Sequence, residues 1–163
     1  MNADAFRHLY NYHCAENRNL WDKYVMSLTQ EQFVQPLEYS IGSVRNQIVH
    51  MMSADNTWFS PLRRLVIPDW LNPDAFNDRA VLRAHWDNLE QTMRDYLAQL
   101  RDDRLFQKPF PPGEDENLIL WQVLLHVANH ATDHRAQLLR LLNDLGVKTI
   151  YQDYIFYVYE NVM

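Results

Sequence analysis

Three histidines, His126, His130 and His134, follow one another at intervals of four residues in the segment LLHVANHATDHRAQLLRLL. Because four residues advance an α-helix by about 400°, their side chains would lie on one face, with Cβ atoms about 5–6 Å apart. Two imidazoles at that separation can bind one divalent metal ion, and a residue of another helix can supply a third ligand. The spacing therefore predicts a metal site that keeps one coordination position open to a reactant.

The alternative interpretation is that these are core histidines, hydrogen-bonded to tyrosines or to the backbone. Burial of three imidazoles at consecutive turns without compensation is costly, which favours metal binding. The sequence lacks the residues of two familiar metal sites. Ala131 stands where a zinc protease has its glutamate, and no Glu-x-x-His pattern for a di-iron centre occurs in the helical segments. Haem ligation is a further, weaker alternative.

Four long helical patterns would position these residues. Apolar residues recur at helical spacing in four segments, Ala3–Leu28, Ser43–Leu65, Asp78–Leu100 and Asn117–Leu145. The tail TIYQDYIFYVYENVM is aromatic and predicts a short helix or strand that covers the bundle. We therefore expect an all-α protein with a single domain over residues 1–163, folded as an up-and-down four-helix bundle with long loops and a short aromatic C-terminal segment.

Composition and charge exclude several other classes. The chain has 163 residues, 47% of them hydrophobic, and a net charge of −6, which argues against disorder and against a nucleic-acid-binding surface. The single cysteine, Cys14, excludes an internal disulfide framework and indicates a reducing compartment. No apolar run has the character of a membrane span or a signal peptide. We expect a cytoplasmic protein with no membrane and no nucleic-acid partner.

Three segments together resemble the DinB/YfiT-like superfamily of metal-binding four-helix bundles. YNYHCAENRNLWDKYVMSL is similar to the family's aromatic-rich first helix, with Asn17 at its recurrent asparagine. SIGSVRNQIVHMMSADNTWF resembles the segment in which a ligand histidine is followed eight residues later by tryptophan, here His50 and Trp58. HVANHATDHRAQLLRLL resembles the Asn-His…His-Arg-Gly-Gln signature, and the resemblance covers nearly the whole chain.

The resemblance implies a set of three metal ligands, His50, His130 and His134. His126 would then be a neighbour of the site, although its stacking makes it a competing ligand. Periodicity alone places His50 on the flank of its helix, so this ligand depends on the resemblance. The chain departs from the signature at Ala136, where glycine is expected, and at Asp133, where a histidine is frequent. Neither departure removes a ligand.

Polar residues around the site are expected to hold the ligands or to line a pocket. A ligand histidine usually donates its other ring N–H to an acceptor. The candidates by position are Asp55, Asp133, Gln137 and Asn17. His13 and Asn17, which project inward from the first helix, could instead line the substrate pocket together with His126. No catalytic residue is assigned.

Three neutral imidazoles would leave a bound cation with its full positive charge, able to activate water or a thiol. We expect zinc or nickel, with iron as an alternative. Relatives implied by the resemblance include thiol-dependent transferases and isomerases and metal-dependent hydrolases. We therefore expect a metal-dependent transferase or hydrolase that acts on a small electrophilic substrate, with a low-molecular-weight thiol in the first case. The alternative is a non-catalytic metal-binding stress or structural protein. The aromatic tail suits a homodimer.

Overall fold

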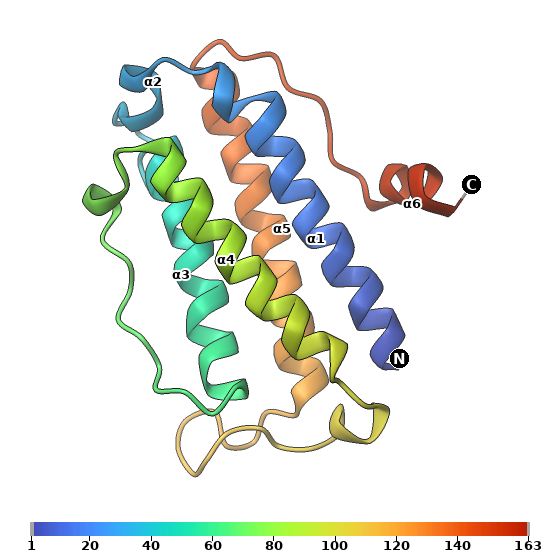
Figure 1. Cartoon of the computed structure of the whole chain (residues 1–163). Helices are drawn as coiled ribbons and strands as arrows, with labels where there is room; N and C mark the ends of the chain where they lie inside the picture. Colours follow the sequence, from blue (N-terminus) through green and yellow to red (C-terminus); the bar gives the residue numbers. More distant parts are fainter. Residues whose placement is uncertain (1, 163) are drawn as a thin grey trace.

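The computed structural model describes residues 2–162, and over that range the chain is all-helical, without a β-strand (Figure 1). The expected all-α class is confirmed. Four long helices pack together: α1 (Ala3–Lys23), α3 (Val44–Leu62), α4 (Arg79–Ala98) and α5 (Leu120–Asp144). Shorter helices connect or follow them: η1 (Val25–Ser27), α2 (Gln30–Val34), η2 (Pro73–Phe76), η3 (Asp102–Arg104) and α6 (Tyr154–Val162).

Side-chain caps explain where three of the long helices begin. The side-chain oxygens of Asn2, Ser43 and Asp78 each accept a hydrogen bond from a backbone N–H two or three residues further on. The fourth start was predicted three residues too early. α5 begins at Leu120, whose N–H donates to the carbonyl of Gln107 at 3.0 Å, so the preceding residues belong to the loop.

Three predicted helix ends also extend too far. The first α-helix stops at Lys23 and the chain tightens into the 3₁₀ turn Val25–Ser27, whereas the sequence pattern continued to Leu28. α3 stops at Leu62 and α4 at Ala98, whereas the patterns continued to Leu65 and Leu100. Leu28 and Leu100 are buried beyond the ends of α1 and α4 and therefore extend the hydrophobic pattern past the helix itself.

The directions of the helices differ from a strict up-and-down order. In Figure 1, α1 and α5 run upward, whereas α3 and α4 both run downward. Arg45, at the start of α3, pairs with Asp74 and with Asn77, which lies just before α4, so the two helices begin at the same end. The connecting segment 63–78 therefore crosses the length of the bundle, and the N–H of Leu71 anchors it to Ser53 of α3 at 3.1 Å.

The core consists of two apolar clusters. One surrounds Trp21 and Trp86, where α1 and α4 meet, and the other surrounds Phe6 and Phe59 near the opposite end. Along α1, the buried polar residues His13 and Asn17 separate members of one cluster from members of the other. A polar layer thus crosses the middle of the bundle.

The aromatic tail forms a helix, α6, against the outer side of α1 (Figure 1). Tyr12 contacts Tyr154 and Tyr157 edge-on, with ring centroids 5.1 and 5.4 Å apart. Ile155 and Phe156 remain exposed, so the tail covers α1 only in part. Within residues 2–162, no helix combines the length and hydropathy needed to cross a membrane.

Candidate metal centre

The predicted ligand histidines meet across the contact between α3 and α5. His50 of α3 faces both histidines of α5, with ring centroids 5.3 Å from His130 and 4.3 Å from His134. The His130 and His134 rings, one turn apart, are separated by 4.2 Å. Three side chains from two helices therefore converge on one point.

The donor atoms fit a single divalent ion. One nitrogen from each of His50, His130 and His134 lies within 4.8 Å of the other two, and the Nε2 atoms of His50 and His134 are 3.1 Å apart. Three nitrogens bound tetrahedrally at 2.0–2.1 Å would be about 3.3 Å apart, so small ring rotations suffice to close the set. Among the described residues, this is the group of histidine, cysteine or carboxylate side chains that could hold a metal.

The electrostatics of the cluster keep these imidazoles neutral. Burial lowers the pKa of His130 to about 4, with His134 and His50 contributing because each disfavours a second positive charge nearby. Burial likewise lowers the pKa values of His50 and His134 below the ordinary imidazole value. At neutral pH the lone pairs are therefore free to bind a cation, as metal ligation requires.

The Gln47 side chain contacts His134 at Nδ1, the ring nitrogen that does not face His50. Gln47 was not among the residues predicted from the sequence. Its side-chain amide lies 2.6 Å from His134 Nδ1, and the residue is fully buried. If His134 binds a metal through Nε2, Nδ1 carries the hydrogen and needs an acceptor, which the Gln47 carbonyl oxygen provides once the amide is turned by 180°. The amide nitrogen would then donate to Ser40 Oγ, which lies 2.9 Å from the other end of the amide. The only sequence signal was its position, one turn before His50.

Asp133 and Gln137 lie at the rim of the site on α5. Gln137 donates to Asp133 at 3.0 Å and also reaches Ser40, whose backbone has a positive φ of 51°. Asp133 favours the protonated form of His134, although burial outweighs it. Both residues thus act on the site through His134 and its neighbours.

His126 is not part of the three-histidine group. It is exposed, its ring is 5.9 Å from that of His130, and it packs edge-on against Trp58 at 4.9 Å. On the opposite flank, Trp70 of the crossover segment covers His50 with a centroid distance of 4.9 Å. Two tryptophans therefore border the histidines on either side.

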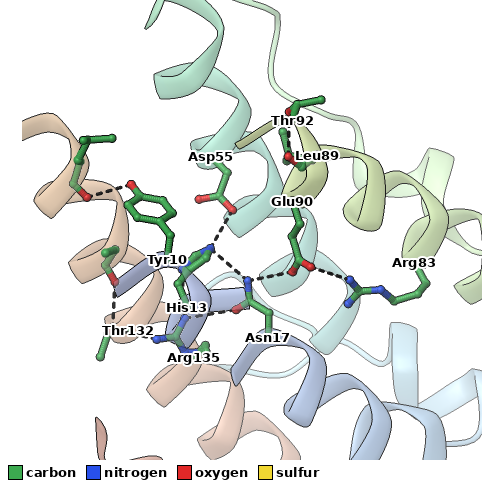
Figure 2. Close-up of polar contacts among 12 residues, drawn as sticks. Tyr10, His13, Asn17, Asp55, Arg83, Leu89, Glu90, Thr92, Thr132 and Arg135 are labelled. Atoms are coloured by element: carbon green, nitrogen blue, oxygen red, sulfur yellow. Dashed lines mark hydrogen bonds and ion pairs between the residues drawn. The ribbon is translucent and has the colours of Figure 1, made fainter. Parts of the chain in front are cut away.

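His13 and Asn17 do point inward, but they do not line an open pocket (Figure 2). Both are almost fully buried, and the Asn17 amide nitrogen lies 3.2 Å from His13 Nε2 and 3.4 Å from Glu90 Oε1. Arg135 donates to Asn17 Oδ1 at 3.3 Å. Their polar atoms are thus used inside the core, and the expected contact with substrate stays a prediction.

Asp55 connects this polar layer to the metal centre. It is 1% exposed, and its Oδ2 lies 3.6 Å from His13 Nε2, without a hydrogen bond (Figure 2). Its charge favours protonation of His130 and opposes deprotonation of Tyr10. Asp55 therefore places negative charge behind the ligand cluster, and Arg135, 1% exposed, places the compensating positive charge in the same layer.

The layer also contains Glu90 and Arg83 of α4. Burial raises the pKa of Glu90, while Arg83, which donates to Glu90 Oε2 at 3.2 Å, opposes that rise. All four long helices thus contribute to one buried polar network beside the three histidines.

Comparison with known proteins agrees with this geometry. A search of curated proteins found no match. A family model described as DinB family matches residues 1–161, which is nearly the whole chain. The three-histidine group is consistent with that match, and the chain belongs to the DinB family.

Proposed function

We propose that the protein is a divalent-metal-dependent enzyme whose metal is held by His50, His130 and His134. The observation that carries the proposal is the convergence of three neutral imidazole donors from two helices on one point. A divalent cation bound there supplies Lewis acidity toward water or a thiol in the remaining coordination position. Gln47 fixes the ring and tautomer of His134, and Asp55 balances positive charge from the buried side.

The reaction that we propose is transfer of a low-molecular-weight thiol to a small electrophilic substrate, or hydrolysis of such a substrate. Both reactions need a nucleophile that carries a negative charge at neutral pH. A ligand set without carboxylates stabilises that charge best, because no ligand charge offsets the positive charge of the metal. In the transfer, the sulfur forms the new bond, the leaving group departs and the thiol proton passes to solvent. Zinc or nickel suits the nitrogen donors, with iron as the alternative.

The second candidate is a metal-binding protein without turnover, which would have a structural or stress-related role. The buried polar network favours this second candidate because it connects the ligand helices to the rest of the bundle. A bound metal would then stabilise the folded protein by mass action. The two candidates differ in whether an added ligand reaches the metal.

Ligand exchange at the open coordination position of the metal distinguishes the two candidates. The protein is loaded with Co²⁺, and 2-mercaptoethanol is added while the visible and near-ultraviolet spectrum is recorded. The enzyme proposal predicts a sulfur-to-cobalt charge-transfer band and shifted d–d bands, both absent in His134→Ala. The control His85→Ala changes an exposed histidine that packs on Phe76, away from the ligand set, and should respond like the native protein. A native spectrum that no thiol alters would favour the non-catalytic candidate.

We further propose a single domain, a cytoplasmic location and a homodimer. The buried, unpaired Cys14 suits a reducing compartment. The exposed Ile155 and Phe156 of α6 supply an apolar surface for a second copy. Sedimentation of native protein and of Phe156→Glu tests the dimer, because a charge on that surface should yield the monomer.

A further inference from the structure

A cavity in the surface of the molecule lies beside the candidate metal centre. It has a volume of about 650 Å³ and opens between the C-terminal end of α3 and the loop that precedes α5. Its apolar wall includes Trp58, Leu65, Ile67 and Phe110. Cavities of this size and character typically bind small molecules.

A row of aromatic rings connects this cavity to the ligand histidines. The His126 ring is 5.9 Å from His130 and 4.9 Å from Trp58, and Trp58 is 6.0 Å from Phe110. Along α3, Trp58 lies eight residues after His50, a rise of about 12 Å. A molecule of moderate length can therefore occupy the cavity and direct one end toward the metal.

The charged groups of the cavity are of both signs and are not paired with one another. Arg64 lies on one wall, and Glu114 and Asp115 lie on the loop. Within residues 2–162, Arg64 forms no ion pair and no side-chain hydrogen bond. The three groups have a net charge of −1, which disfavours binding of a simple anion. The guanidinium of Arg64 disfavours binding of a simple cation.

The backbone fixes the place of Arg64. It follows α3 with a positive φ of 63°, and the N–H of Leu65 closes the helix end on the carbonyl of Ser60 at 2.9 Å. Glycine is the usual residue in this conformation, and any other side chain costs about 1 kcal/mol there. An exposed arginine thus stands at the mouth of an apolar cavity, at a position whose backbone conformation favours glycine.

We propose that this cavity binds a small molecule with a flat apolar body and a zwitterionic α-amino carboxylate head. The body would lie between Trp58 and Phe110, the carboxylate would bind the fork of Arg64, and the ammonium group would face Glu114 and Asp115. Such a ligand satisfies the unpaired groups of both signs, which neither an anion nor a cation does. The part of this inference that directs the ligand toward a metal rests on the proposed function, whereas the charge selectivity does not.

Three matched probes test the charge selectivity on metal-free, full-length protein. They are 4-fluorophenylalanine, 3-(4-fluorophenyl)propionate and 2-(4-fluorophenyl)ethylamine, and binding is followed by ¹⁹F NMR titration. We expect the amino acid to bind about fivefold tighter than either analogue, because each analogue lacks one charged contact. Equal affinities, tighter binding of one analogue, or no binding of the amino acid would overturn the proposal.

Variants assign the contacts. Arg64→Gln should weaken the amino acid and the propionate about fivefold and leave the amine unchanged. The adjacent Arg63 does not line this cavity, so Arg63→Gln should leave all three probes unchanged. Glu114→Gln combined with Asp115→Asn should weaken the amino acid and the amine. An equal effect of Arg63→Gln and Arg64→Gln would show a general charge effect and would contradict the assignment.

A cobalt arm tests the link to the metal separately. With Co²⁺-loaded protein, the ¹⁹F line of bound 4-fluorophenylalanine should broaden beyond that seen with the Zn²⁺-loaded protein, because the unpaired electrons relax a nearby nucleus. Equal line widths would show that a ligand in the cavity does not lie close to the metal. Failure of the proposed function would instead appear in the thiol titration, with the selectivity among the three probes unaffected.

Discussion

Replacement of Gln47 by leucine isolates the hydrogen bond that lies behind the metal centre. The side chain contacts His134 Nδ1 at 2.6 Å and is 0% exposed. Leucine has a similar volume but no acceptor, so the His134 N–H would be left without a partner while the ligand atoms themselves remain. The change thus perturbs the orientation and basicity of one ligand.

The size of the effect follows from burial. Loss of an outer partner of a ligand histidine lowers metal affinity about 10- to 100-fold, or about 1.4–2.7 kcal/mol. Because Gln47 is fully buried, water does not replace the lost acceptor, and we expect the upper part of that range. Gln47→Glu should bind metal at least as tightly as the native protein, since a carboxylate accepts the same hydrogen bond more strongly.

Competition for Zn²⁺ against a chromophoric chelator measures these affinities. Gln91→Leu, an exposed change on α4, serves as the matched control and should equal the native protein. If Gln47→Leu also equals the native protein, Gln47 does not support His134 and the proposed arrangement behind the ligand is refuted. Circular dichroism on the same samples separates loss of affinity from loss of fold.

Two further predictions concern stability. The metal-free protein should become less stable as the pH falls from about 6.5 to about 4, because the unfolded chain takes up a proton at the ordinary imidazole pKa, whereas folded His130 does so only near 4. Urea midpoints across that range measure the trend, which His130→Ala should flatten; a rising midpoint would contradict it. Arg135→Leu should destabilise the protein by about 3 kcal/mol, because it removes buried hydrogen bonds to Asn17 and Thr132 and the positive charge that balances Asp55. Arg140→Leu, which removes an exposed pair with Asp144, should cost about 0.5 kcal/mol or less, and equal losses for the two arginines would count against the buried network.

Helical periodicity predicted the four long helices because each buries one apolar stripe, and that stripe is visible in a single sequence. It did not predict that α3 and α4 run in the same direction. Direction depends on how far the segment 63–78 travels, and that segment has no regular pattern of its own. Its anchors, such as Leu71 on Ser53 and Asp74 on Arg45, are individual contacts between residues far apart in the chain.

The three-histidine group that we propose as the ligand set was predictable in part. The spacing of His130 and His134 indicated metal binding by itself, whereas His50 required the family resemblance because it lies off the apolar stripe of its helix. Gln47 was missed because a glutamine one turn from a histidine is unremarkable on any helix surface. His13 and Asn17 were correctly predicted to point inward, but their role depends on partners from three other helices.

Metal content of the purified protein and of single histidine variants tests the central claim most directly. We predict one divalent ion per chain in the native protein and in His126→Ala, and loss of that ion in His50→Ala, His130→Ala and His134→Ala. Full retention of metal in His50→Ala, together with its loss in His126→Ala, would contradict the site assembled by α3 and α5.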